Sequence, residues 1–248
     1  MRLPAMKGVI ERRMLINFRA DPAAVAKLLP PPFEPTVVRG HAIVGICLIR
    51  LGEIRPAFLP GACGIRSENA AHRFAVHWRD GGRQREGVYI PRRDTSSRLN
   101  ALAGGRLFPG VHQRAAFRVV ESHPSYELEM NSDDAKGSVH VCARATTEWP
   151  STSVFETVDE ASAFFRAGSL GYSATHRSGA FDGLELRCDR WQAEPLTVDA
   201  TRSSYFENSG LFPPGSVEFD CGLLMRDISH EWRGRGQLCC PVAVGAAE

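Results

Sequence analysis

A short segment near the middle of the chain, residues 107–117 (LFPGVHQRAAF), carries three polar side chains in a row. His112, Gln113 and Arg114 follow a Pro-Gly turn and precede an apolar strand. Polar side chains at the point where a loop enters a strand commonly line a ligand pocket. An imidazole there can act as a general base near neutral pH, and a guanidinium can bind an anion. The segment therefore predicts a pocket wall made of His112, Gln113 and Arg114.

The composition restricts the class of protein and the kind of partner. With 43% apolar and 23% charged residues, the chain has the composition of a globular protein with a sizeable core. A net charge of +2 without a polybasic run argues against nucleic acid or a membrane surface as partner. The N-terminal sequence lacks the apolar core of a signal peptide, and no apolar run is long enough to span a membrane. We therefore expect a cytoplasmic protein.

The seven cysteines are scattered, and no two of them form a C-x-x-C pair. This pattern favours reduced, mostly buried thiols over a disulfide framework or a zinc site. His72 and His77 lie five residues apart on an alternating strand, so their side chains point to opposite faces and cannot share one metal ion. No phosphate-binding glycine loop, G-x-S-x-G or H-E-x-x-H motif is present. We expect neither a metal nor a cofactor.

Apolar periodicity predicts a sheet-rich fold with a few short helices. One helix begins at the Asp21-Pro22 cap and ends at Pro30, a second is capped at Asp94 and ends at Gly104-Gly105, and a third covers 158–167. Segment 196–215 is expected to be irregular. Strands are expected at 8–18, 41–51, 67–78, 86–91, 115–120, 125–131, 138–149, 170–176, 183–191 and 217–232. Because the strands do not alternate with helices, this order indicates a single α+β domain over 1–248, with a large antiparallel sheet closing towards a barrel.

Three segments, in order, resemble the acetoacetate decarboxylase family. They are ERRMLINFRADPAAVAKLLPPPFEP near the N-terminus, IRSENAAHRFAV, and LFPGVHQRAAF. Later segments (GSLGYSATHRSG, GLELRCDRW and EPL) resemble an uncharacterised bacterial branch, the domain of unknown function 2071. The resemblance covers nearly the whole chain. It implies an acetoacetate decarboxylase-like fold with a barrel cavity for a small molecule, assembly into a dimer or higher oligomer, and an active-site glutamate at Glu68.

One difference from the family bears on the chemistry. Where acetoacetate decarboxylases have two adjacent lysines, this chain has Gln113 and Arg114, and the Schiff-base lysine falls on Gln113. An amide nitrogen cannot condense with a ketone, and a guanidinium stays protonated. The lysines of this chain, Lys7, Lys27 and Lys136, lie in the N-terminal segment, on a helix's polar side and in a hairpin turn. The resemblance therefore implies the fold without the covalent amine.

The remaining candidates are assigned to substrate binding. Arg12 or Arg13 matches the family's first-strand arginine, and the register decides which of them faces Glu68, since a slip of one residue reverses the face. Tyr172, His176 and Trp191 are candidates for the far wall of the pocket, although core packing is an alternative.

These residues predict a protein that binds a small molecule in its cavity, either a keto acid or another carboxylate or carbonyl ligand. Glu68, His112, Gln113 and Arg114 are the catalytic candidates, with acid–base chemistry of a lyase or hydratase type and no Schiff base. The alternatives are a non-catalytic ligand-binding or regulatory protein of the same fold and a decarboxylase-type lyase that uses a displaced lysine.

Overall fold

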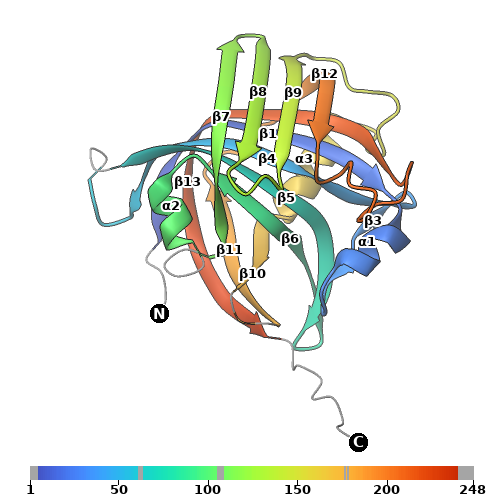
Figure 1. The fold of residues 1–248 in the computed structure, drawn as a ribbon, viewed down its shortest axis with the longest axis horizontal. Coiled ribbons are helices and arrows are strands. Elements are labelled where there is room, and N and C mark those ends of the chain that lie inside the picture. The colour runs from blue at the N-terminus through green and yellow to red at the C-terminus, as the bar shows by residue number, and fades with distance from the viewer. Residues whose placement is uncertain (1–4, 61–63, 105–108, 176, 178, 240–248) are drawn as a thin grey trace, which may run out of the picture.

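The computed structural model describes residues 5–60, 64–104, 109–175, 177 and 179–239. Their strands pair into a 13-stranded sheet that curls back on itself (Figure 1). The helices are α1 (Pro22–Leu28), α2 (Arg98–Ala103) and α3 (Val158–Ala167). The strands are β1 (Met6–Ala20), β2 (Glu34–Pro35), β3 (Val37–Val38), β4 (His41–Pro56), β5 (Ile65–Asp80), β6 (Arg83–Thr95), β7 (His112–Ser122), β8 (Ser125–Ser132), β9 (Ser138–Ala145), β10 (Leu170–Ala174), β11 (Ala180–Cys188), β12 (Glu194–Ser203) and β13 (Val217–Cys239).

The pairing of the strands closes two rings that share five long strands. The first ring runs β1–β4–β5–β6–β10–β11–β13 and returns to β1. The second leaves β6 through β7, β8, β9 and β12 and returns through β13. Strands β7, β8, β9 and β12 stand together at the top of Figure 1, and β10 and β11 lie below them. The large sheet with few helices expected from the sequence is confirmed.

The central parts of β1, β4, β5 and β13 are buried on both faces, and their sequences there are rich in apolar residues. On β1, Met14 and Ile16 belong to one core cluster and Leu15 to the other. The first cluster is shared with β7, β8, β9 and β12, and the second includes Phe155 and Phe165 from the α3 region. A residue's position in the alternation of a shared strand therefore decides which core it enters.

Two of the predicted helices begin where the sequence indicates. The Asp21 carboxylate accepts hydrogen bonds from the backbone N–H groups of Ala23 (2.7 Å) and Ala24 (3.2 Å), and Pro22 occupies the first turn. The third helix covers Val158–Ala167, and the Thr157 hydroxyl caps it. Since no helix among the described residues is long and apolar enough, none of them could cross a membrane.

The second predicted helix begins later than expected. Asp94 is not its cap, because Asp94 is the penultimate residue of β6 and both its oxygens accept from Arg92 at 2.8 Å. The Ser97 side chain caps α2 instead, accepting from the Asn100 N–H at 3.2 Å. Asp94 is fully buried, so it also cannot form a solvent-facing pair with Arg98 at the start of α2.

The sheet differs from the prediction in two further respects. Residues 194–203, expected to be largely irregular, form β12, whose mostly half-exposed and exposed side chains give little apolar periodicity. Strand β9 ends at Ala145, so Trp149 lies in the loop that follows, where its indole N–H donates to the Phe155 carbonyl at 2.8 Å. The sheet is also mixed, because β6 pairs in parallel with both β7 and β10.

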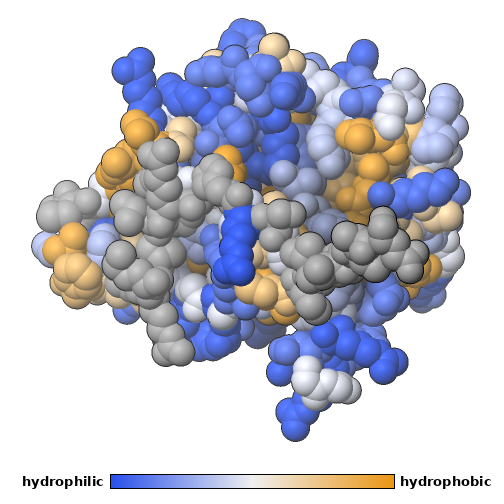
Figure 2. Space-filling view, turned by 60° about the horizontal axis from the view of Figure 1, so that its bottom comes forward, coloured by the Kyte–Doolittle hydropathy of each residue, from blue (hydrophilic) through white to orange (hydrophobic). Residues whose placement is uncertain are grey.

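The outer surface carries apolar side chains in small separate groups. On the face seen in Figure 2, the described apolar side chains lie among hydrophilic ones and form no single broad patch. The large apolar side chains that are exposed are Val37, Phe58, Leu59, Leu99, Leu102 and Val120. Scattered exposure of this kind is normal for a folded chain.

Candidate functional site

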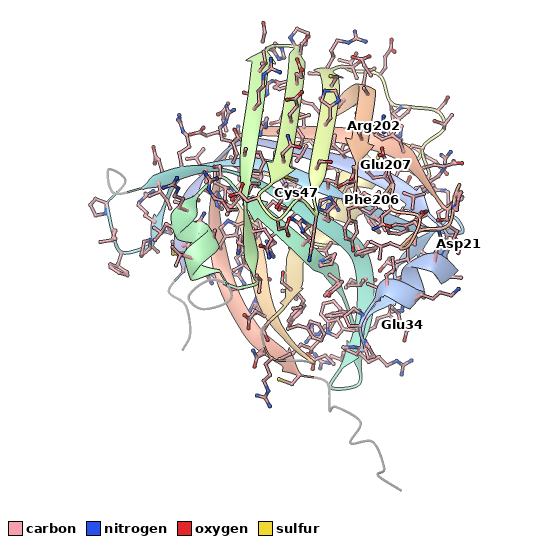
Figure 3. The ribbon with its side chains drawn as sticks, in the orientation of Figure 1. Asp21, Glu34, Cys47, Arg202, Phe206 and Glu207 are labelled. Atoms are coloured by element: carbon pink, nitrogen blue, oxygen red, sulfur yellow. The ribbon has the colours of Figure 1, made fainter. Side chains whose placement is uncertain are left out.

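A cavity of about 160 Å³ lies inside the first ring of strands. A cavity of about 150 Å³ is large enough for a molecule the size of benzene. Much of its wall is apolar, from Ile49, Leu51, Ile54, Val88, Ile90, Leu184 and Trp232. Its polar residues are Arg13, Cys47, Asn69, Arg73, Arg93, Asp94, Asn100, His112 and Ser169. The labelled Cys47 lies towards the middle of the ribbon in Figure 3, whereas Asp21 and Glu34 lie at its edge.

Arg73 enters this cavity from the centre of β5. Its side chain is buried, and one terminal nitrogen donates to the Asn17 side-chain oxygen. The guanidinium carbon lies 4.6 Å from the centroid of the Phe165 ring of α3, a cation–π contact. Its Nε has no hydrogen-bond partner among the described residues. Arg73 is therefore a buried cation whose Nε–H has no partner among the described residues.

Arg13 reaches the same cavity from β1. Its Nε lies 3.4 Å from the Cys47 Sγ, and its guanidinium carbon lies 5.2 Å from the centroid of the Trp191 ring. The Trp191 N–H donates to the Ser162 hydroxyl of α3 at 3.0 Å, which fixes the ring against the arginine. Trp191 thus contacts a residue of the cavity wall.

Arg93 and His112 meet where β6 and β7 pair. Arg93 Nε donates to the Ser173 hydroxyl at 3.0 Å. His112 Nδ1 lies 3.0 Å from the Gly110 carbonyl, which can only accept, so Nδ1 carries the proton and Nε2 has a free lone pair. Gly104 allows this packing, because a Cβ there would lie 2.6 Å from His112 Nδ1.

The cavity wall carries an excess of positive charge. None of Arg13, Arg73 and Arg93 forms an ion pair with a carboxylate of the described residues, while Asp94 is already paired with Arg92. Burial lowers the pKa of Arg73 and of Arg93 to about 10, so both remain protonated at neutral pH. Burial and the nearby Arg93 lower the pKa of His112 to about 4, so its imidazole is neutral. The wall therefore holds three cations that have no counter-ion in the described part of the chain, beside one neutral base.

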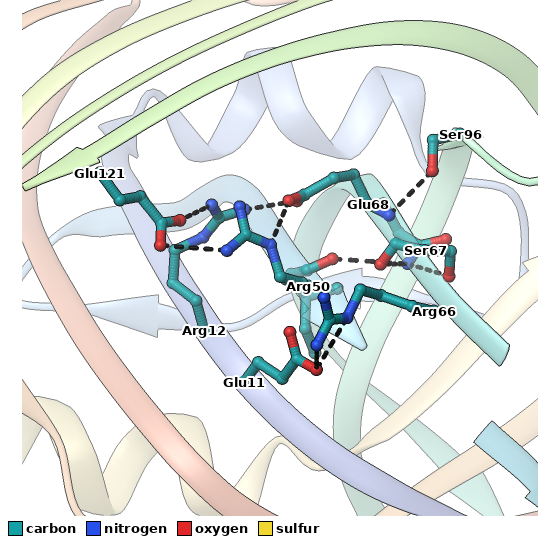
Figure 4. A network of polar contacts seen from close by, with 10 residues as sticks. Glu11, Arg12, Arg50, Arg66, Ser67, Glu68, Ser96 and Glu121 are labelled. Carbon is teal, nitrogen blue, oxygen red and sulfur yellow. Dashed lines mark hydrogen bonds and ion pairs between the residues drawn. The ribbon is translucent and has the colours of Figure 1, made fainter. Parts of the chain in front are cut away.

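Glu68, the position at which the family resemblance implies an active-site glutamate, does not line this cavity. It belongs to a cluster with Arg12, Arg50 and Glu121 (Figure 4). The Glu68 carboxylate accepts from Arg12 at 2.6 Å and from Arg50 at 2.5 Å. Glu121 accepts from Arg12 and, at 3.1 Å, from Arg50. Two carboxylates thus balance two guanidiniums, and both Glu68 oxygens are occupied.

Strand alternation explains the separation of Glu68 from the cavity. Arg12 and Arg13 are neighbours on β1 and point to opposite faces, so Arg12 meets Glu68 and Arg13 meets the cavity. On β5, Glu68 and Arg73 diverge in the same way, being five residues apart. The register left open by the sequence is thereby settled, with Arg12 as the partner of Glu68.

Of the four residues predicted to be catalytic, His112 is the one that the structure places on the cavity wall. Arg114 donates to the Ala115 carbonyl at 2.6 Å and lies outside that wall, as does the half-buried Gln113. Neither Glu68 nor Arg114 lines this cavity. Tyr172 packs in the first core cluster against Phe33 and Trp78. His176 lies outside the described residues.

Two arginines of the cavity wall, Arg73 and Arg93, were not predicted from the sequence. Arg73 and Arg93 were visible as charged residues inside or at the end of strands that otherwise read as buried. Because arginine is almost never fully buried unless it is paired, an arginine in such a strand is a signal for a functional cation. The lysines Lys7, Lys27 and Lys136 are all exposed, and the cavity wall contains none of them.

The family model DUF2071, described as an uncharacterized conserved protein, matches residues 9–220. The chain belongs to the DUF2071 family. No curated protein sequence matches it.

Solved structures share the fold of this DUF2071 chain at low sequence identity. Acetoacetate decarboxylase from Legionella pneumophila subsp. pneumophila strain Philadelphia 1 is similar with a TM-score of 0.61 and 11% identity, over 96% of this chain and 88% of that one. An acetoacetate decarboxylase-like enzyme from Sphingomonas wittichii RW1 gives 0.58 and 14%, over 97% and 94%. The enduracididine biosynthesis enzyme MppR complexed with pyruvate gives 0.57 and 12%, over 96% and 91%.

Proposed function

We propose that this protein binds a small carboxylate-bearing ligand, a keto acid, in the cavity of the first ring. One observation carries the proposal: Arg13, Arg73 and Arg93 line one cavity, and none has a carboxylate partner among the described residues. Burying a cation without a counter-ion is costly. A ligand carboxylate entering the cavity supplies that counter-ion, with charge-assisted hydrogen bonds from the guanidiniums.

The chemistry we propose is acid–base catalysis without a covalent amine, as in a lyase or hydratase. The neutral His112 offers Nε2 as a proton acceptor beside the bound acid, and a guanidinium beside the ligand's carbonyl stabilises negative charge that develops there. The exposure of all three lysines supports a mechanism without a Schiff base, since that reaction needs a desolvated amine. The pyruvate complex of MppR, which has a similar fold, supports the choice of a keto acid.

Calorimetric titration with pyruvate tests the proposal. We expect pyruvate to bind the wild-type protein, and the affinity to fall by about tenfold or more in Arg13→Met and Arg73→Met, because each loses a charged hydrogen bond in a desolvated site. Pyruvamide, which lacks the carboxylate charge, should bind correspondingly more weakly. Arg66→Met is the matched control, since Arg66 is 73% exposed and lies in an outer groove away from the cavity.

Equal affinity in the wild type and both cavity variants would rule out the proposed site, provided that circular dichroism shows the variants to be folded. Borohydride reduction in the presence of pyruvate separates the chemical part of the proposal from the binding part. We expect this treatment to increase the mass of no lysine. A stable adduct would favour the displaced-lysine alternative.

A further inference from the structure

The outer face of β8 and β9, away from the cavity, gathers three side chains of different metal-binding types. The ligand atoms of Glu127, His140 and Cys142 all lie within 4.8 Å of one another. Glu127 is directly opposite Cys142 in the antiparallel pairing, and His140 lies two residues before Cys142 on the same face. The two strands therefore bring together residues that are distant in the sequence.

The separation of the histidine and cysteine atoms fits a tetrahedral metal. His140 Nε2 and Cys142 Sγ are 3.5 Å apart. Zinc bonds of about 2.3 Å to sulfur and about 2.0–2.1 Å to nitrogen, at the tetrahedral angle, place those two atoms about 3.5 Å from each other. The separation of the two ligand atoms therefore matches that of two corners of a zinc tetrahedron.

The same side chains are available for a ligand. The side chains of His140 and Cys142 make no hydrogen bond with the described residues besides the contact between them, and Glu127 makes no ion pair or hydrogen bond with those residues. The neighbouring carboxylates are occupied: Asp199 is paired with Arg144 at 3.0 Å, and Glu129 lies 3.7 Å from Arg118. Glu127 is therefore the acidic group of this face that lacks a cation.

The local charge favours a bound cation. The carboxylates of Glu127, Asp199 and Glu129 are near enough to Cys142 to interact with it electrostatically. A divalent ion bound there offsets the repulsion between a thiolate and these carboxylates and displaces the thiol proton. All three side chains are half-buried, so the site is open to solvent from outside the sheet.

We propose that Glu127, His140 and Cys142 form a binding site for one zinc-class divalent metal ion. The thiolate and imidazole select a borderline-soft transition metal over magnesium or calcium, which prefer oxygen ligands. Three protein ligands leave a fourth position for water, as in open zinc sites. The ion links β8 to β9 and is independent of the arginine-lined cavity.

Titration with cobalt(II), which takes zinc's place at thiolate sites, tests this proposal. Tag-free protein stripped with a chelator is titrated with CoCl₂ while the near-ultraviolet cobalt–thiolate charge-transfer band is followed, and ZnCl₂ is then added. We expect one equivalent of cobalt to produce the band and zinc to abolish it. Cys142→Ser should lose the band, and His140→Ala and Glu127→Gln should each weaken binding by at least about tenfold.

The controls remove a cysteine and a histidine of similar or greater exposure elsewhere. Cys239→Ser and His123→Ala lie outside the cluster and should keep the band and the affinity of the wild-type protein. Absence of the band in wild-type protein, or its persistence in Cys142→Ser, would overturn the site. Unchanged affinity in His140→Ala or Glu127→Gln would overturn the three-ligand assignment.

Discussion

At the scale of single residues, neighbouring arginines on one strand have different electrostatic roles. Arg12 is 2% exposed and shares two carboxylates with Arg50, so its charge is compensated by the protein. Arg13, one residue further, faces the cavity without a carboxylate. The first arrangement stabilises the fold, and the second leaves a cation for a ligand. The distinction follows from strand alternation rather than from residue type.

This distinction gives a prediction for Glu68. Glu68→Gln removes the negative charge opposite Arg12 while keeping the side-chain shape, so a buried guanidinium loses part of its compensation. We expect the free energy of unfolding to fall by about 1–3 kcal/mol, a range reduced from that of fully buried pairs because Glu121 remains. Urea denaturation measures this change.

Glu11→Gln is the matched control for Glu68→Gln. The partner of Glu11 is the exposed Arg66, and such surface pairs contribute only about 0–1 kcal/mol. Pyruvate affinity should be unchanged in both variants, because neither residue lines the cavity. A Glu68→Gln protein with wild-type stability and lost pyruvate binding would instead support the catalytic role that the family resemblance assigns to Glu68.

At the scale of elements, the sequence predicts those whose signals are local. The Asp21-Pro22 cap of α1, the Gly168 end of α3 and the apolar run in β4 were all readable because each depends on neighbouring residues. The cap of α2 was misplaced because two acceptors, Asp94 and Ser97, compete for it. The competition is decided by Arg92, whose bidentate contact holds Asp94 in β6.

The candidate site was less predictable than the elements, for a physical reason. His112 was found because its loop-to-strand position is a local signal. Arg73 and Arg93 were not, since their meeting with Arg13 depends on the closure of β1, β5 and β6 into one ring. The Glu127, His140 and Cys142 cluster was hidden in the same way. The expectation of no metal rested on the cysteine spacing, on His72 and His77 and on the missing motifs, and none of these signals shows that β8 pairs with β9.

At the scale of the whole molecule, the closed rings bury ionisable groups that would titrate in the unfolded chain. Burial is the main cause that lowers the pKa of His72 to about 3 and of His112 and His230 to about 4, from an ordinary value of 6.5. The nearby Arg92, Arg93 and Arg13, respectively, lower these pKa values further. The folded protein therefore holds these three imidazoles neutral.

The free energy of unfolding therefore depends on pH. Between about pH 4 and 6.5 the unfolded chain binds protons that the folded protein does not, so the free energy of unfolding falls as the pH is lowered through this window. Urea denaturation at about pH 7.5 and about pH 5, one above and one below the ordinary histidine pKa, measures this loss of stability. His112→Asn removes one of the three titrating groups. The free energy of unfolding lost per pH unit should then be smaller by up to about 1.4 kcal/mol, the amount that corresponds to one proton. Stability that is constant or higher at the lower pH would contradict the burial of these groups.

The most direct test of the central claim is a crystal structure of the protein with bound pyruvate. We predict that the pyruvate carboxylate lies inside the first ring, within hydrogen-bond distance of at least one of the Arg13, Arg73 and Arg93 guanidiniums. Its carbonyl carbon should form no bond to a lysine. Pyruvate bound instead in the outer groove beside Arg12 and Arg50, or joined covalently to Lys7, Lys27 or Lys136, would contradict it.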